Sequence, residues 1–271
     1  MRRLITIACK GSTLAGTLDE APGTTGLLIV SGGNEIRTGA HRGMAMLAQR
    51  LAADGWPVLR FDRRGIGDSE GDNAGFEASG PDIAAAAAAF RIQCPQLRIV
   101  AGFGNCDAAT ALALFGADAG VDALILANPW VIEPNGDLPP PAAIRARYAE
   151  RLLSLDGWKR LLTGSVNLRA LLRGIGAVAR PATPSVLAAR LADALSAYRG
   201  SIRIILAERD GTALAFADTW RRPAFAALAA RITIDRIQTG SHSFARGDDP
   251  DRLAMAVMTA LRSYGQGRTN D

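Results

Sequence analysis

Short strand-like segments rich in apolar residues alternate with stretches of helical spacing along most of the chain. Residues 3–18 alternate between apolar and polar side chains around two glycines, which predicts an opening β-hairpin. Residues 26–30 form a continuous apolar run, typical of a buried parallel strand. Further strands are predicted at 57–62, 97–102, 123–128, 202–207 and 232–237, which are rich in apolar and β-branched residues. Apolar side chains recur at helical spacing at 41–53, 81–93, 107–116, 214–230 and 249–263. This alternation predicts an α/β fold with a mostly parallel central sheet that helices cover on both faces.

The alternation of strands and helices stops at Pro129 and returns at Ile202. The segment between them contains three consecutive prolines, 139–141, and then leucine-rich helical patterns without a convincing strand. We expect this segment, residues 129–200, to form a helical lid over the sheet. Residues 1–128 and 201–271 then form the core, which suits one large domain with an insertion in a chain of 271 residues.

A candidate nucleophile lies where the run 97–102 meets the helix predicted from residue 107. Gly104 and Ala108 flank Cys106 two residues away on each side, which is the Gly-x-Nuc-x-Gly spacing of a nucleophile elbow with Ala in the last place. Small residues there let a strand and a helix pass closely at a sharp turn. The N-terminus of the following helix favours a thiolate and an oxyanion. Because Cys is also a common small residue of apolar cores, the motif alone leaves a purely structural role open.

Two more residues suited to nucleophilic catalysis follow later predicted strands. Asp210 comes after the run 202–207, and His242, one of two histidines in the chain, comes after the run 232–237. Ligands bind beyond the carboxyl ends of parallel strands, so we expect Cys106, His242 and Asp210 to meet there as a triad. Taken singly, Asp210 could simply begin a turn, and a histidine after a strand is often incidental.

The order nucleophile, acid, histidine is that of the α/β-hydrolases, and the chain resembles this superfamily over nearly its whole length. The motifs that match are Ser31-Gly32-Gly33-Asn34, Asp62-Arg63-Arg64-Gly65-Ile66-Gly67-Asp68-Ser69 and Gly104-Asn105-Cys106-Asp107-Ala108, with Asp210 and His242. More narrowly, residues 32–42, the loop 61–71 and Cys106-Asp107 look like the first of the hydrolases encoded beside bacterial exosortase A systems. Those systems accompany exopolysaccharide production and the sorting of tagged surface proteins.

The resemblance implies an α/β-hydrolase fold and a division of roles within the triad. Cys106 would attack an acyl carbonyl as a thiolate. His242 would take the thiol proton and return it to the leaving group, while Asp210 holds its imidazole in the correct tautomer.

The resemblance also implies an oxyanion hole built from backbone N–H groups. The N–H of Asp107 and that of either Gly33 or Asn34 would donate to the oxyanion. The chain departs from a typical esterase in three places: Cys stands for Ser at the nucleophile, Ala108 for Gly at the elbow, and Ser31 for the usual His.

Arg37 and His41 flank the predicted oxyanion loop and are candidate substrate-binding residues for an anionic substrate. The alternative is a solvated helix start without a functional role. Asp62 and Arg64 are expected to brace loops, following the superfamily pattern.

Composition limits the partners of the protein. The net charge of +5 comes almost entirely from scattered arginines without a basic block, so nucleic-acid binding is not expected. Three cysteines and two histidines show no metal-ligand spacing, and neither a metal nor another cofactor is expected. An odd cysteine count and the lack of a secretion signal predict a cytoplasmic location. No apolar run approaches the ~18 residues of a membrane span.

These residues predict a hydrolase that acts on a small-molecule acyl ester or thioester through a covalent thioacyl-enzyme intermediate. The alternative is an acyltransferase that passes the acyl group to a sugar or another alcohol in exopolysaccharide- or exosortase-linked metabolism. A non-catalytic binding protein on a hydrolase scaffold is a third class, which the intact triad disfavours. The sequence gives no indication of an oligomeric state.

Overall fold

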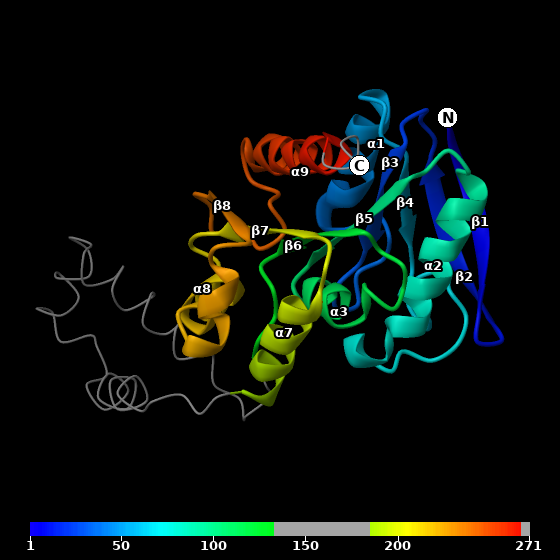
Figure 1. Ribbon diagram of the computed structural model, residues 1–271. Helices are drawn as coiled ribbons and strands as arrows, with labels where there is room; N and C mark the ends of the chain where they lie inside the picture. Colours follow the sequence, from blue (N-terminus) through cyan, green and yellow to red (C-terminus); the bar gives the residue numbers. More distant parts are fainter. Residues whose placement is uncertain (133–184, 267–271) are drawn as a thin grey trace, which may run out of the picture.

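The sheet is the centre of the molecule. The structure, a computed structural model, describes residues 1–132 and 185–266. Within that part of the chain, eight strands form one sheet in the order β1-β2-β4-β3-β5-β6-β7-β8 (Figure 1). The strands are β1 (Arg2–Cys9), β2 (Ser12–Asp19), β3 (Thr25–Val30), β4 (Val58–Phe61), β5 (Ile99–Asn105), β6 (Ala123–Ala127), β7 (Ser201–Ala207) and β8 (Thr233–Ile237). β2 pairs antiparallel with β1 and β4, and the remaining pairs are parallel. The predicted opening hairpin and mostly parallel sheet are therefore confirmed.

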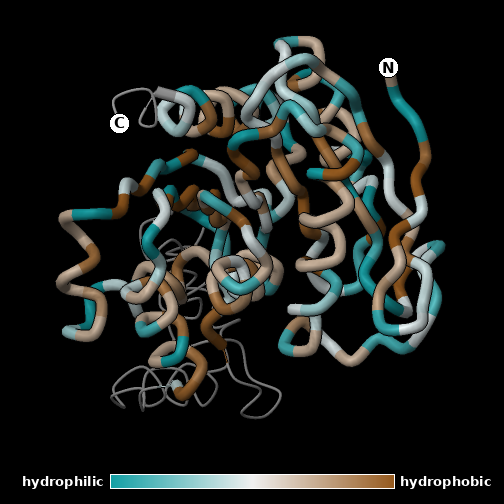
Figure 2. Tube along the Cα trace, turned by 45° about the vertical axis from the view of Figure 1, so that its right-hand side comes forward, coloured by the Kyte–Doolittle hydropathy of each residue, from teal (hydrophilic) through white to brown (hydrophobic). Residues whose placement is uncertain are grey.

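Helices cover both faces of the sheet, as the alternation predicts. The main helices described are α1 (Gly43–Ala53), α2 (Gly80–Gln93), α3 (Asp107–Phe115), α7 (Val186–Ala197), α8 (Gly211–Trp220) and α9 (Asp249–Gln266). Buried side chains of α1 and α9 form one apolar cluster with the sheet, while those of α2, α3, α7 and α8 form another on the opposite face (Figure 1). In Figure 2, hydrophobic residues run through the interior strands between these layers. None of the described helices is both long and apolar enough to cross a membrane.

The helix predicted over residues 214–230 is shorter in the structure and begins earlier. Asp210 caps α8 by accepting hydrogen bonds from the N–H groups of Thr212 and Ala213, so the helix starts at Gly211. It stops at Trp220 because a proline at 223 forces the preceding residue into an extended conformation. A 3₁₀ turn, η3 (Pro223–Leu228), takes up the rest of the predicted helix.

Most of the predicted lid, 129–200, lies outside the described residues. β6 pairs directly with β7, so the segment between them adds no described strand to the sheet. Its last part is described and contains α7, which Ser185 caps by accepting a hydrogen bond from the Ala188 N–H. Buried leucines of α7, Leu191 and Leu195, pack in the same apolar cluster as α3. The division of the chain into core and lid stays a prediction.

Gly104, near the end of β5, lets the next helix approach the strand. A Cβ atom at Gly104 would lie 2.6 Å from the carbonyl carbon of Ala108 and 2.8 Å from the nitrogen of Ala109. Both atoms belong to the backbone of α3 and cannot turn aside as a side chain could. The close packing of β5 against α3 therefore requires glycine at this place.

Gly104→Ala is expected to destabilise the protein by about 1–3 kcal/mol, because the added methyl group overpacks the strand against α3. Thermal unfolding checks this outcome. Gly43→Ala is the matched control: a Cβ there meets nothing within 4 Å, and the residue already has helical φ and ψ. The control should be neutral or gain about 0.4–1 kcal/mol. Equal melting temperatures for the two variants would contradict this account of the elbow.

Candidate active site

Cys106 occupies a strained turn between β5 and α3. Its φ of 64° and ψ of −127° lie outside the regions that non-glycine residues usually adopt. Backbone hydrogen bonds hold it there: its N–H donates to the Ala127 carbonyl at 3.0 Å, and its carbonyl accepts from the N–H groups of Trp130 at 3.2 Å and Ala109 at 3.1 Å. The half-buried thiol thus stands beside the first turn of α3, where free N–H groups favour negative charge.

Asp210 and His242 form a hydrogen-bonded pair at the carboxyl edge of the sheet. Asp210 follows β7, and its Oδ2 lies 3.0 Å from Nδ1 of His242, which comes from the loop after β8. Burial favours the neutral form of the Asp210 carboxyl, but the bonds from His242 and from two N–H groups of α8 outweigh it. The pKa of Asp210 therefore lies below its usual value. At neutral pH the carboxylate is charged and orients the imidazole.

The imidazole of His242 lies between Asp210 and the nucleophile candidate. Hydrogen bonds with Asp210 and with Cys106 raise the pKa of His242 to about 10, against the opposing effect of burial. The structure therefore brings Cys106, His242 and Asp210 together in one contiguous arrangement. The raised pKa keeps the imidazole of His242 protonated at neutral pH, beside the Cys106 sulfur.

The candidate oxyanion loop is bound to the elbow by the side chain of Asp107. The N–H of Gly33 donates to Oδ1 of Asp107 at 2.7 Å. A Cβ atom on Gly32 would lie 2.7 Å from that same oxygen, so the glycine makes room for the carboxylate. The two candidates for the second oxyanion donor are the N–H groups of Gly33 and Asn34. The Gly33 N–H already donates to the Asp107 carboxylate. The N–H groups of Asn34 and Asp107 donate to no other described residue.

Arg63, which the sequence motifs did not single out for a role, lies beneath this loop. Its side chain is buried, and Nη2 donates to the Gly33 carbonyl. Burial lowers the pKa of Arg63, while the charges of Asp107 and Asp82 act in the opposite direction. Within the described residues, its Nε and Nη1 have no hydrogen-bond partner. Arg63 thus places a buried positive charge next to the Asp107 carboxylate.

Arg37 and His41, the candidate substrate-binding residues, make no described contact with the triad. The Arg37 guanidinium forms ion pairs with Asp62 and Asp68 and donates to Thr17 Oγ1 at 3.1 Å. In this arrangement it braces the loop after β4. His41 is exposed and has a positive φ of 52° in a short 3₁₀ turn. A substrate contact by either residue stays a prediction.

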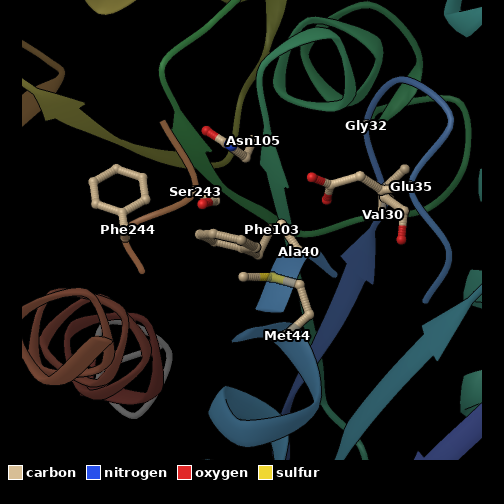
Figure 3. Close-up of a pocket in the computed structure, with 10 residues that line it drawn as sticks. Val30, Gly32, Glu35, Ala40, Met44, Phe103, Asn105, Ser243 and Phe244 are labelled. Atoms are coloured by element: carbon tan, nitrogen blue, oxygen red, sulfur yellow. The ribbon is translucent and has the colours of Figure 1, made fainter. Parts of the chain in front are cut away.

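A small cavity lies among the ends of β3 and β5, the start of α1 and the loop after β8 (Figure 3). Phe103, Met44 and Phe244 supply its apolar walls, and Asn105 and Ser243, the neighbours of Cys106 and His242 in the chain, also line it. Its volume of about 20 Å³ suits roughly one water molecule and is far too small for an acyl chain.

Comparisons with known proteins give matches in structure alone. No family model matches the chain, and no curated protein does. The esterase Pf2001 of Pyrococcus furiosus superposes with a TM-score of 0.66 at 13% identity, over 97% of this chain and 91% of the esterase. XC6422 of Xanthomonas campestris, described as a serine hydrolase without a lid, gives 0.60 at 16% identity, over 97% and 94% of the two chains. A thioesterase domain from the curacin biosynthetic pathway gives 0.56 at 11% identity, over 97% and 99%. The chain therefore has the α/β-hydrolase fold.

The raised pKa of His242 predicts a pH dependence of stability. A folded-state pKa of about 10, above the ordinary 6.5, gives a stabilisation that is complete below about pH 6.5 and lost as pH rises towards 10. Imidazole ¹⁵N NMR should show His242 still protonated at pH 8, with His41→Gln assigning the second resonance. Asp210→Asn should lower the His242 pKa and flatten the pH dependence of unfolding, while its amide still caps α8. An unchanged His242 titration in Asp210→Asn would contradict the pairing.

Proposed function

We propose that this protein is a hydrolase that cleaves an acyl ester or thioester through a covalent intermediate on Cys106. The observation that carries the proposal is the strained elbow that presents the Cys106 thiol to an imidazole held by Asp210. Strain at a single non-glycine residue persists where the surrounding structure over-determines it, and it is typical of catalytic sites. The fold shared with esterases and a thioesterase domain is consistent with this chemistry.

Acylation begins from the thiolate and the imidazolium. The Cys106 sulfur attacks the acyl carbonyl carbon, a C–S bond forms, and the carbonyl electron pair moves onto oxygen. The tetrahedral intermediate collapses, the bond to the leaving group breaks, and the imidazolium of His242 donates its proton to the departing oxygen or sulfur. Since the raised pKa of His242 favours the protonated imidazole, the histidine acts first as the acid.

Deacylation uses the same residues in reverse. Neutral His242 takes a proton from water, and the resulting hydroxide attacks the thioester carbonyl. The second tetrahedral intermediate expels the Cys106 thiolate and releases the acid, while the proton remains on the imidazole. Asp210 keeps the imidazole in place through both halves of the cycle.

The oxyanion hole that we propose consists of the N–H groups of Asp107 and Asn34. The Asp107 N–H begins α3 and adds the favourable field of the helix N-terminus. We assign the second donor to Asn34 because the Gly33 N–H already donates to the Asp107 carboxylate. That bond then serves to brace the loop, and Arg63 supports it from below.

An acyltransferase is the second candidate, and the nucleophile itself favours it. A thioester on Cys106 keeps more acyl-transfer potential than the oxygen ester of a serine enzyme would. On the narrower resemblance of residues 32–42 and 61–71, the acceptor would be a sugar hydroxyl linked to exopolysaccharide metabolism. Product analysis with and without an alcohol acceptor separates the two: an acylated acceptor formed at the expense of free acid identifies the transferase.

Replacing the nucleophile tests the proposal directly. Cys106→Ala is expected to lower turnover of an activated thioester by several orders of magnitude. Cys106→Ser should keep weak ester hydrolysis and lose most of the native activity, because an alkoxide is much harder to form than a thiolate. Cys94→Ala is the control: that thiol is buried in the apolar core, and activity per folded molecule should be unchanged. Full turnover by Cys106→Ala would exclude the proposed mechanism.

A pair of substitutions at Asp107 tests the assignment of the oxyanion donors. In Asp107→Asn, the amide oxygen can still accept from the Gly33 N–H, so turnover should stay within a few-fold of wild type. Asp107→Ala removes the brace and is expected to lower kcat roughly tenfold or more through the displaced loop. Steady-state kinetics of both variants provide the measurement. Faster turnover by Asp107→Ala would instead identify the Gly33 N–H as the oxyanion donor and the carboxylate as its competitor.

A further inference from the structure

Two asparagines connect the carboxyl ends of three strands to the backbone of His242. The Ala207 N–H donates to Asn128 Oδ1 at 2.8 Å, and Asn128 Nδ2 donates to Asn105 Oδ1 at 3.0 Å. Asn105 Nδ2 then donates to the His242 carbonyl at 3.0 Å, with Asn128 Nδ2 also within 3.4 Å of that oxygen. We call this row of hydrogen bonds the asparagine relay.

The direction of the asparagine relay follows from its two ends. A backbone N–H can only donate and a carbonyl oxygen can only accept. With Ala207 donating at one end and His242 accepting at the other, each amide can take only one of its two orientations. Every bond therefore points the same way, from β7 towards the histidine loop, and aligned bonds in a buried site strengthen one another.

The relay residues lie at adjacent strand ends. Asn105 ends β5, Asn128 directly follows β6 and Ala207 ends β7, and these strands are neighbours in the sheet (Figure 1). Asn128 is fully buried and has a φ of 42°. A side chain other than Asn or Gly is strained at such a φ. Both its burial and its backbone conformation thus fit a residue placed for its side-chain bonds.

Ala207 is hydrogen-bonded, directly or through the relay, to both the acid and the base of the triad. The Ala207 carbonyl accepts the Asp210 N–H at 2.9 Å, while the Ala207 N–H begins the bonds that end at His242. Asn105 also directly precedes Cys106 in the chain. The loop is also bonded to the segment after β7, for example from the Arg209 N–H to the Thr239 carbonyl at 2.9 Å. Among the described hydrogen bonds, however, those from Asn105 and Asn128 are the ones that reach the backbone of His242. The relay is thus a link from the sheet to the backbone of His242 itself.

We propose that Asn105 and Asn128 are positioning residues, which fix the His242 imidazole at its distance from Asp210 and Cys106 by holding its backbone carbonyl. The proposal rests on the proposed function for the role of the histidine. Neither asparagine side chain donates to a reacting atom. Their proposed role is therefore to position His242 and not to take part in the reaction.

The experiment breaks the relay at two different links. Asn128→Gly removes the side chain while tolerating the positive φ, and Asn105→Ala removes the second amide. The readouts are the His242 pKa, from imidazole ¹⁵N NMR, and the rate of Cys106 alkylation by iodoacetamide at pH 7.5. Tyr264→Phe is the matched control, because its hydroxyl donates to the Leu124 carbonyl of β6 at 3.0 Å, a buried side-chain bond to the strand that precedes Asn128.

Each single variant is expected to lower the His242 pKa from about 10 towards 6.5 and to slow alkylation roughly tenfold or more. The double variant should resemble Asn105→Ala, because Asn128 acts mainly by holding the Asn105 amide, whose bond to the His242 carbonyl is the shorter one, and the two losses do not add. Tyr264→Phe should lose comparable stability and keep the wild-type pKa and alkylation rate. If a general loss of packing caused the changes, the His242 pKa and the alkylation rate of Tyr264→Phe would change as well.

An unchanged His242 pKa and alkylation rate in the folded variants would overturn the proposal, and so would equal shifts in Tyr264→Phe. If Asn128→Gly does not fold, Asn105→Ala decides alone, since Asn105 is only half-buried. Neither readout requires turnover. The expected shifts in a protein that forms no acyl adduct would therefore reject the hydrolase function and support the asparagine relay.

Discussion

The turn at Cys106 is the constraint on which the site depends. A non-glycine residue with a φ of 64° is held between a strand and a helix by backbone hydrogen bonds to Ala127 and Trp130. The turn is possible because Gly104 lets α3 approach β5 closely. Its geometry puts the thiol beyond the sheet edge, next to the first turn of α3. Since Asn105 precedes the same turn, the strained backbone also fixes one member of the asparagine relay.

Charge at the site is arranged in two adjacent pairs. Asp210 and Cys106 together raise the pKa of His242 to about 10, and in the proposed mechanism the protonated imidazole is the acid for the leaving group. On the other side of the elbow, the Asp107 carboxylate binds the Gly33 N–H above the buried guanidinium of Arg63. The first pair suits proton transfer, and the second braces the loop from which we propose the second oxyanion donor. The elbow connects them, because Cys106 and Asp107 are consecutive residues.

Much of the fold and the candidate triad could be predicted from the sequence because each depends on local patterns. Apolar segments predict the strands, and Cys106, Asp210 and His242 each lie within the five residues that follow the end of one. The α8 boundary was missed because Asp210, taken for the triad, also acts as the helix cap. The asparagine relay could not be predicted, since its bonds join residues 23, 79 and 137 positions apart. Likewise, nothing in the motif indicates that the Asp107 side chain reaches Gly33.

The central claim is that Cys106 carries the acyl group, and the most direct measurement is mass spectrometry of the enzyme quenched during turnover of an activated thioester. We expect the mass of the enzyme to increase by one acyl group, and peptide mapping should place that group on Cys106. The fraction of acylated enzyme should rise during the first turnover and then stay constant. Wild-type enzyme in which Cys94 or Cys9 carries the adduct, or turnover with an unmodified Cys106 at every time point, would contradict it.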